Sequence, residues 1–387
     1  GQFIDPIYQN MAYIPQKQLL NLQKAVKPGK VAIVYGPRRA GKTTLLKQYL
    51  QSTEDEALFV TGDDIFAREY LESQSVKKLG EFVGKHSLLV IDEAQYVRQI
   101  GLNLKLIVDH ISNVRIIATG SSSFDLAKDI GEPLTGRKTV LKLLPLAQME
   151  ISNIEEPHET RANLESRLVY GSYPEVVLMQ SNRDREDYLQ ELISSYLFKD
   201  VLQLEGIRHS DKLQRLLQLL AFQIGNEVSR AELGRQLGMS KNTVESYLDL
   251  LEKVFVIYRR SGFRRNLRKE ITKSHRYYFL DTGVRNALIR NFNPLSLRND
   301  VGTLWENYVI TERMKKQEYL RQHLNTYFWR TYDKKEIDLI EEREGKLFGF
   351  EIKWGSSGKK APKDWIGAYP DASFDVIHPE NYLDFIQ

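Results

Sequence analysis

The sequence predicts an α/β protein in which a parallel-sheet unit, a helical region and a mixed α/β unit follow one another. Residues 31–150 alternate short apolar runs with amphipathic stretches, as strands and helices do in a parallel α/β unit. Residues 160–251 show only the apolar spacing of helices. After Pro294 the sequence predicts one helix followed by several short apolar runs. The 387 residues leave room for two to four units of about 100 to 200 residues each. We expect a first unit at residues 1–150, a helical connecting region at 151–208, a second unit at 209–293 and a third at 294–387.

The composition excludes several classes of protein. With 42% hydrophobic and 27% charged residues, the chain is of ordinary globular type, and no stretch approaches the ~18 consecutive apolar residues of a membrane span. The first residues lack the pattern of a secretion signal, so we expect a soluble, cytoplasmic protein. Because there is no cysteine, disulfides, cysteine nucleophiles and thiolate zinc sites are excluded. The net charge of +4 is too small for a general polycation.

Four short apolar runs in the first unit are typical of strands buried on both faces. They are rich in Val and Ile and do not alternate in polarity, as in a parallel sheet covered by helices. The runs are Val31–Tyr35, Ala57–Thr61, Leu88–Ile91 and Val114–Ala118.

A phosphate-binding loop follows the first run. The segment from Gly36 to Thr43 reads G-P-R-R-A-G-K-T, a complete G-x-x-x-x-G-K-T between a strand and a helix. We expect Lys42 to reach the β- and γ-phosphates of ATP and the Thr43 hydroxyl to ligate Mg²⁺. The expected nucleotide-binding residues are Gly36, Pro37, Arg38, Arg39, Ala40, Gly41, Lys42, Thr43, Thr44 and Ser121.

Two acids end the third run. Asp92 is expected beside the Mg²⁺ ion and Glu93 where it polarises an attacking water, although solvated acids at a strand end would look the same. Ser121 follows the fourth run and either senses the γ-phosphate or caps a helix. Arg137 either reaches a γ-phosphate, in its own or a neighbouring subunit of a homo-oligomer, or forms a surface salt bridge.

The second unit has the pattern of a helix-turn-helix followed by a hairpin. Helices are expected at residues 211–225, 229–237 and 241–253, with a glycine-containing turn before the third and an apolar strand at Phe255–Tyr258 after it. Lys241, Asn242 and Thr243 then lie at the exposed start of the third helix, where a recognition helix contacts bases.

A basic run extends from Arg259 to Arg276. Its arginines at positions 264, 265 and 268 are expected on the hairpin, or wing, where they contact DNA phosphates. A winged helix that binds another protein, and a hairpin that is only solvated, remain alternatives. The DNA-binding candidates are Lys241, Asn242, Thr243, Arg264, Arg265 and Arg268.

The third unit carries a possible metal site. Asp338 lies in the run Glu336–Ile340 and Glu351 in the run Leu347–Ile352, so the two acids are expected on neighbouring strands of a hairpin. Glu351 and Lys353, two residues apart, point to the same face. Glu306, on the helix expected at Thr303–Tyr319, adds a third acid. Glu306, Asp338 and Glu351 are the candidate ligands of Mg²⁺, and Lys353 positions or deprotonates a water.

These motifs together resemble a known prokaryotic family. The loop at 36–43, Asp92-Glu93, Ser121–Ser123, Leu134–Arg137, Leu144–Leu146, Tyr170–Glu175 and Tyr278–Gly283 are similar to AAA-like P-loop ATPases that carry a C-terminal domain of unknown function 4143. Such proteins commonly have an arginine before the first strand, where this chain has Gln16. The Asp338 and Glu351-x-Lys353 pattern resembles the restriction-endonuclease-like superfamily.

The resemblance implies a Mg²⁺-dependent ATPase domain, a winged helix and a mixed α/β restriction-endonuclease-like domain. We expect ATP and Mg²⁺ as cofactors, DNA as a partner and no membrane. Glu93, Lys42 and Arg137 would serve ATP hydrolysis, and Asp338, Glu351 and Lys353 would serve DNA cleavage. Two alternatives are a DNA-binding or scaffolding protein with a silent nuclease fold, and a nucleotide-gated signalling protein without nucleic acid.

Overall fold

A computed structural model describes residues 13–121, 133–197, 210–263, 275–331, 335–355, 358 and 360–387. The expected DNA contacts Arg264, Arg265 and Arg268 lie outside these residues, as do Ser122 and Ser123. Within the described part of the chain, none of the helices has the length and apolar character that crossing a lipid bilayer requires.

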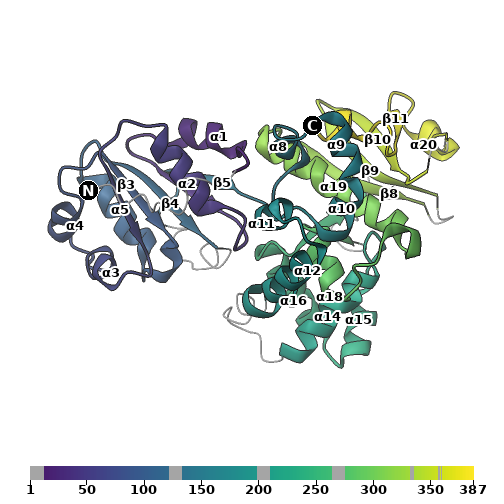
Figure 1. Ribbon diagram of the computed structural model, residues 1–387. Coiled ribbons are helices and arrows are strands. Elements are labelled where there is room, and N and C mark those ends of the chain that lie inside the picture. The colour runs from purple at the N-terminus through teal and green to yellow at the C-terminus, as the bar shows by residue number, and fades with distance from the viewer. Residues whose placement is uncertain are drawn as a thin grey trace.

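The first unit is a parallel sheet of five strands, as the apolar runs predicted (Figure 1). The order is β2-β3-β4-β1-β5, with the phosphate-binding loop leaving the carboxyl end of β1. The strands are β1 (Val31–Tyr35), β2 (Ala57–Thr61), β3 (Leu88–Asp92), β4 (Arg115–Gly120) and β5 (Lys138–Lys142). The sequence analysis missed β5, an edge strand whose two lysines and partial exposure hide the apolar signal.

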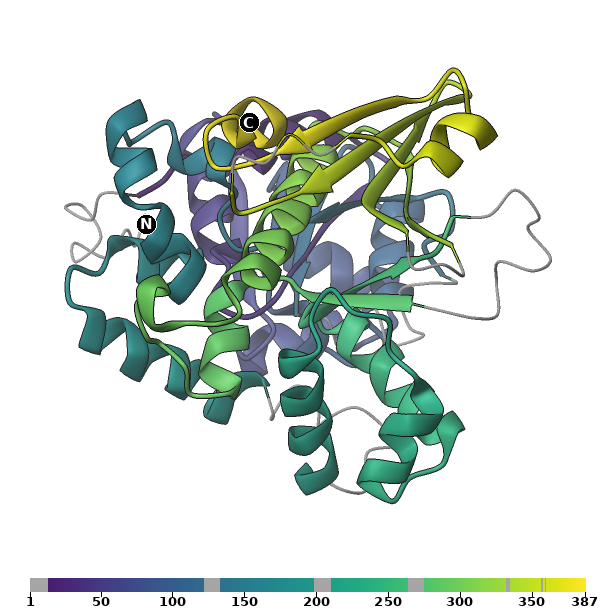
Figure 2. The same ribbon diagram turned by 90° about the vertical axis from the view of Figure 1, so that its right-hand side faces the viewer.

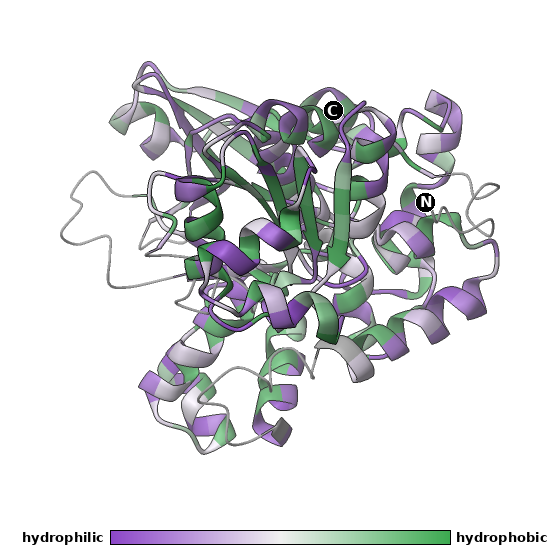
Figure 3. Cartoon of the chain, turned by 90° about the vertical axis from the view of Figure 1, so that its left-hand side faces the viewer, coloured by the Kyte–Doolittle hydropathy of each residue, from purple (hydrophilic) through white to green (hydrophobic). Residues whose placement is uncertain are grey.

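Helices cover both faces of this sheet. One face packs under α3 (Ile65–Leu71), α4 (Val76–Val83) and α5 (Ile100–His110), and the other under α1 (Gln18–Ala25) and α2 (Lys42–Gln51). A short 3₁₀ turn, η2 (Ala94–Tyr96), follows β3. Every residue of β1 and β3 is buried, and Figure 3 shows these strands as a predominantly hydrophobic layer. The continuous apolar runs of the sequence therefore reflect burial on two faces.

The middle of the chain packs around one core. Side chains from Val169 to Leu288 form a single hydrophobic cluster, so the helical connecting region and the second unit are not separated by a boundary near residue 208. The helices before that position are α8 (Gln148–Ile151), α9 (Pro157–Ala162), α10 (Leu164–Tyr170), α11 (Pro174–Leu178), α12 (Asn182–Glu191) and the π-helical turn η3 (Leu192–Leu197). Those after it are α14 (Ser210–Phe222), α15 (Arg230–Leu237), α16 (Lys241–Lys253) and α18 (Thr282–Leu288), and the antiparallel pair β6 (Ile257–Ser261) and β7 (His275–Phe279) follows α16.

The last unit is a mixed four-stranded sheet with the order β11-β10-β9-β8. Strands β8 to β10 are antiparallel, and β11 runs parallel to β10. The long helix α19 packs beneath this sheet (Figure 2). The elements are the turn η4 (Leu295–Leu297), α19 (Val301–Tyr319), β8 (Asn325–Arg330), β9 (Glu336–Arg343), β10 (Lys346–Ile352), α20 (Lys363–Ala368), β11 (Ser373–Ile377) and α21 (Tyr382–Ile386).

Helix α19 also joins this last unit to the first one. The Lys315 ammonium is 1% exposed and donates to the Leu146 carbonyl at 3.0 Å, to the Ser172 hydroxyl at 3.0 Å and to Glu312 at 2.7 Å. The Glu312 carboxylate in turn accepts a hydrogen bond from the Gln148 N–H at 2.6 Å. The three units are thus connected by a buried polar contact region as well as by the chain.

Candidate functional site

The phosphate-binding loop has the shape that its sequence predicts. Gly41 caps α2 with φ = 96°, a backbone conformation that favours glycine, and a Cβ there would lie 2.5 Å from the Gln16 amide nitrogen. The Lys42 ammonium is 4% exposed and donates to the carbonyls of Gly36 and Pro37, each at 3.0 Å. Lys42 is therefore held inside the loop, where a nucleotide's phosphates would sit.

Asp92 joins β3 to this loop. Its carboxylate accepts a hydrogen bond from the Thr43 hydroxyl at 2.6 Å and another from the Thr119 hydroxyl at the end of β4. Thr43 and Asp92, both expected to hold Mg²⁺, therefore lie side by side. A hydroxyl and a carboxylate are oxygen ligands of the kind that Mg²⁺ prefers, so these residues fit that ion.

Glu93 lies next to Asp92 at the same edge of the sheet. It is half-buried and its carboxylate accepts from the Gln95 amide, while the Gln95 carbonyl oxygen accepts from the Ser121 N–H at 3.3 Å. The chain thus places Glu93 and the buried Ser121 on two sides of one glutamine, near the phosphate-binding loop.

Gln16 occupies the position where the resembling family has an arginine. Its side chain is 6% exposed and its amide donates to the Ala40 carbonyl inside the loop at 3.2 Å. Gln16 therefore supports the loop backbone, a contact that a neutral amide makes without adding charge beside the phosphates.

Arg137 does not lie at this site. Its carbonyl accepts from the Val31 N–H, which places Arg137 at the amino end of β1, whereas the loop leaves the carboxyl end. Five strand residues, about 17 Å, separate the two ends. The prediction that Arg137 reaches its own γ-phosphate is therefore wrong, and its guanidinium instead pairs with Asp109 at 2.9 Å.

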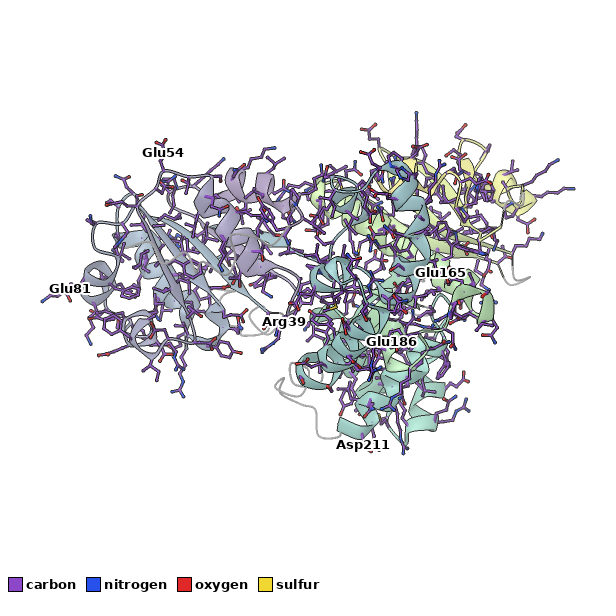
Figure 4. The ribbon with its side chains drawn as sticks, viewed as in Figure 1. Arg39, Glu54, Glu81, Glu165, Glu186 and Asp211 are labelled. Atoms are coloured by element: carbon purple, nitrogen blue, oxygen red, sulfur yellow. The ribbon has the colours of Figure 1, made fainter. Side chains whose placement is uncertain are left out.

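The other two arginines of the loop point toward the helical region. Arg39 forms a half-exposed ion pair with Glu175 of α11 at 3.2 Å, and Figure 4 shows it on the side of the first unit that faces the second. Arg38 donates to the Tyr96 hydroxyl at 3.2 Å and lines a small cavity together with Tyr173 and Phe255. The loop is therefore in contact with the helical region through residues beside the phosphate site.

The helices α15 and α16 follow one another across a short turn, where the sequence predicts two helices. Gly238 ends α15 in the left-handed conformation, and the Ser240 hydroxyl caps α16 by accepting from the Thr243 N–H at 3.1 Å. Lys241 and Asn242 are exposed at the start of α16, and Thr243 is partly exposed. These three residues thus lie on an accessible helix end, as the sequence predicted.

The described arginines of the basic run face inward. Arg259 pairs with Asp249 at 2.9 Å and Glu252 at 3.2 Å, whereas Arg260 and Arg276 are 2% and 3% exposed. Arg260 stacks on the rings of Tyr258 and Tyr278. Three of the basic residues that the sequence analysis placed on a phosphate-binding surface therefore contact other parts of the protein instead.

A carboxylate cluster, formed by Glu306, Glu336, Asp338 and Glu351, lies where α19, β9 and β10 meet β7. Phe350 pairs with Leu339 across the β9–β10 hairpin, so Asp338 and Glu351 are the next residues along the two strands. Asp338 accepts from the Ile352 N–H at 2.9 Å, and Lys353 pairs with Glu351 at 2.8 Å. The structure therefore brings the predicted nuclease-like residues together.

Arg276 enters this cluster from β7. Its guanidinium lies 2.6 Å from Glu336, 3.5 Å from Asp338 and 3.7 Å from Glu306, and Glu306 also accepts from the Tyr278 hydroxyl at 2.8 Å. The sequence analysis placed Arg276 in the basic run and missed this role. The strict alternation of β7, which puts residues 276 and 278 on one face, is the signal that pairs them.

The electrostatics of the cluster follow from burial. Burial, and then repulsion by Asp338, raises the pKa of Glu306, and burial together with repulsion by Glu351 raises the pKa of Asp338. Burial lowers the pKa of Lys353, but the hydrogen bond with Glu351 and the charge of Asp338 more than offset this and leave the pKa above its usual value. The surrounding carboxylates therefore favour the charged form of Lys353.

The predicted metal centre does not fit this arrangement. Among the residues that the structure describes, no three His, Cys, Asp or Glu side chains converge in a way that would hold a metal ion. Glu306, Asp338 and Glu351 were expected to do so, but the Arg276 guanidinium contacts both Glu306 and Asp338. We therefore derive no reaction step through a metal at this cluster.

Three stretches of the chain match known domain families. Residues 28–152 match an AAA domain, residues 161–295 match a domain of unknown function (DUF8612), and residues 301–376 match another (DUF4143). The chain carries an AAA-type P-loop ATPase domain followed by a C-terminal DUF4143 domain. The DUF8612 match spans the helices that share one core on either side of residue 208.

Relatives of similar architecture occur in bacteria and archaea. An uncharacterized protein of Mycobacterium tuberculosis is 29% identical over 336 residues, which cover 86% of this chain and 72% of the relative. An uncharacterized protein of Methanocaldococcus jannaschii is 24% identical over 335 residues, which cover 81% and 74%. A solved Walker-type ATPase of Pyrococcus abyssi superimposes with a TM-score of 0.50 at 16% identity and covers 73% of this chain and 97% of its own, a similarity of fold.

Thr119 and Gln95 support the acids of the AAA domain site. Thr119 donates to Asp92 and its hydroxyl also accepts from the Glu93 N–H at 3.1 Å, so it fixes both acids. Gln95 links Glu93 to Ser121. Thr119 ends β4, the strand beside β3, and that adjacency is the signal that points to it.

Proposed function

We propose that this protein is a Mg²⁺-dependent ATPase whose carboxyl-terminal half binds DNA and carries a catalytically silent nuclease-like fold. The observation that supports the ATPase most directly is the contact of Thr43 with Asp92 at 2.6 Å beside the enclosed Lys42. A loop, a lysine, a hydroxyl and a carboxylate at the carboxyl edge of a parallel sheet are the groups that ATP hydrolysis requires.

In this proposal, different residues of the AAA domain bind the phosphates, hold the metal ion and orient the attacking water. Backbone N–H groups of residues 36–43 and the amino end of α2 bind the phosphates. The Lys42 ammonium exchanges its carbonyl partners for phosphate oxygens, and Thr43 and Asp92 hold Mg²⁺, which neutralises charge on the phosphates when it is bound. Glu93 orients the attacking water, with its own carboxylate positioned by Gln95.

The proposal for DNA rests on the accessible end of α16. Lys241 and Asn242 are exposed at its start, and the β6–β7 pair follows as a wing would. A lysine and an amide at a helix start suit a phosphate and a base edge, respectively. Arg259, Arg260 and Arg276 are engaged within the protein, so the proposal assigns the phosphate contacts of the basic run to Arg264, Arg265 and Arg268, which lie outside the described residues.

Two observations favour a silent nuclease fold over an active nuclease. Arg276 lies among the carboxylates that would bind metal, and the raised pKa of Lys353 keeps that side chain protonated. A metal-dependent cleavage reaction needs carboxylates that are open to a metal ion and a group that activates water, and both observations count against these requirements.

Binding of duplex DNA measured by fluorescence anisotropy tests this function. We expect the affinity to fall as salt rises from about 50 to about 200 mM, and Lys241→Ala to weaken binding and reduce the slope of log K against log salt by about 1. Lys253→Ala is the matched control, because Lys253 is exposed at the opposite end of α16, about 18 Å away.

The same measurement, repeated with ATP and Mg²⁺, tests the coupling between the two halves. We expect the nucleotide to change DNA affinity in the parent protein but not in Lys42→Ala. Absence of DNA binding at the lowest salt would contradict the DNA proposal and favour a signalling protein that acts without nucleic acid. Cleavage of plasmid that Asp338→Asn abolishes would show that the nuclease fold is active.

A further inference from the structure

We propose that Arg276 is the built-in cation of the carboxylate cluster and that it excludes a divalent metal ion from the position between Glu306 and Asp338. This inference does not depend on DNA binding or on ATP hydrolysis. It concerns the described contacts between β7 and the DUF4143 domain.

A single nitrogen of Arg276 contacts the two carboxylates that a shared metal ion would need. Nη1 lies 3.5 Å from Asp338 Oδ1 and 3.7 Å from Glu306 Oε1, while Nη2 lies 2.6 Å from Glu336 Oε2. A divalent ion shared by Asp338 and Glu306 would have to lie about 2.0 to 2.6 Å from both oxygens. Because Nη1 already contacts both of these oxygens, its positive charge and its volume compete with a divalent ion for them.

The cluster needs a cation because it is buried. Asp338 is 3% exposed and Glu351 is not exposed at all. Buried carboxylates are costly unless a positive charge or a proton compensates them. Lys353 pairs with Glu351 and also acts on Asp338, whereas Arg276 is the cation that contacts Asp338, Glu306 and Glu336 directly.

Arg276 is also fixed by its surroundings. Its guanidinium lies 4.6 Å from the centre of the Phe328 ring on β8. In the antiparallel β6–β7 pair, Arg276 lies opposite Arg260. Since the arginine belongs to the hairpin and the acids belong to α19 and the last sheet, the ion pairs hold the hairpin against the DUF4143 domain. Hairpin docking and metal binding are therefore mutually exclusive at this cluster.

Thermal unfolding with and without Mn²⁺ tests the proposal on the full chain. Every variant carries Lys42→Ala and is measured without nucleotide, so that the ATP site does not contribute. Without the Arg276 substitution, the midpoint should not respond to Mn²⁺. Arg276→Gln should gain about 2 to 4 °C at a saturating excess of Mn²⁺, and the added change Asp338→Asn should remove that gain.

Arg259→Gln is the matched control. Arg259 is the sequence neighbour of Arg260 on the same hairpin but pairs with α16, so its loss should create no response to Mn²⁺. A Mn²⁺ response in the protein that retains Arg276 would show that the arginine does not exclude metal. A folded Arg276→Gln protein without a Mn²⁺ response would show that the cluster is no cation site.

Arg276→Met keeps the contact with Phe328 and serves as a second uncharged variant. If either uncharged variant folds only when Mn²⁺ is present, the proposal is supported, because one cation then replaces the other. Failure of both variants to fold at any Mn²⁺ concentration would overturn it.

Discussion

Asp92 is the residue that organises the nucleotide site. One carboxylate accepts from Thr43 on α2, from Thr119 on β4 and from the Glu93 N–H at 3.2 Å. Because two of these donors come from α2 and β4, Asp92 fixes the end of β3 against the loop and the neighbouring strand. If Glu93 orients the attacking water as proposed, nucleotide binding depends on the loop and hydrolysis on Glu93.

Substitutions at Lys42 and Glu93 should separate these two steps. Lys42→Ala removes the cation that faces the β- and γ-phosphates and should abolish measurable ATP binding. Glu93→Gln should leave ATP binding intact and lower kcat by about 100-fold or more, since an amide cannot orient water as a carboxylate does. Binding is measured by calorimetry and turnover by phosphate release, with the exposed Glu69→Gln as control. If Glu93→Gln hydrolyses ATP at the rate of the parent protein, another residue orients the attacking water.

At the scale of elements, two turns interlock behind the nucleotide site. Asp281 caps α18 by accepting from the Val284 N–H at 3.0 Å and also accepts from the Ser172 N–H at 2.7 Å, so it ties the end of β7 to the turn after α10. Asp281 is buried, and this burial raises its pKa. Gly171 makes room for this contact, because a Cβ there would lie 2.2 Å from the Asp281 carboxylate.

Gly171→Ala should therefore destabilise the protein. It combines a left-handed backbone, with φ = 75°, and a steric collision, and we expect a loss of about 2 to 4 kcal/mol. Gly80→Ala in α4 is the control, because a Cβ there meets nothing within 4 Å and should stabilise the helix by about 0.5 to 1 kcal/mol. Thermal unfolding measures both. Equal midpoints for the two variants would show that the turn adapts.

At the scale of the whole molecule, buried polar groups connect the AAA domain to α19. Glu150 is 1% exposed and accepts from the Lys17 N–H at 2.7 Å and the Ala147 N–H at 2.8 Å. Asn21 of α1 donates to the carbonyl of Tyr319 at 2.9 Å, across 298 residues. The AAA domain and the DUF4143 domain are therefore parts of one folded body.

Glu150 should make stability depend on pH. Burial, only partly opposed by these hydrogen bonds, raises the pKa of Glu150 from 4.5 to about 7. In this range the folded state binds more protons than the unfolded state. The contribution of Glu150 to the free energy of unfolding therefore falls as pH rises from about 4.5 to about 7, by at most about 1.4 kcal/mol per pH unit. Glu150→Gln should flatten this slope of the midpoint against pH. The exposed Glu159→Gln should retain it, and an unchanged slope in Glu150→Gln would assign the effect elsewhere.

Features carried by local spacing could be predicted from the sequence. Four strands of the first sheet, helix α16 and the pairing of Asp338 with Glu351 followed from runs and motifs of a few residues. The position of Arg137 could not be predicted, because a Gly-Arg pair does not say at which edge of the sheet it lies. The role of Arg276 depends on how the β6–β7 hairpin packs against the last unit. The spacing of residues within either segment does not reveal this packing. The same holds for the single core shared across residue 208.

The contact between Lys315 and the Leu146 carbonyl has a consequence for synthesis. The two residues are 169 positions apart, so at about 5 to 20 residues per second the ribosome adds Lys315 roughly 8 to 34 s after Leu146. During this interval the amino-terminal sheet is complete, but Gln148 lacks Glu312 and the backbone at Leu146 lacks its ammonium partner. The nascent chain therefore passes through a stage in which its first domain is formed with an unfinished polar surface, and it reaches its final stability only when α19 has been made.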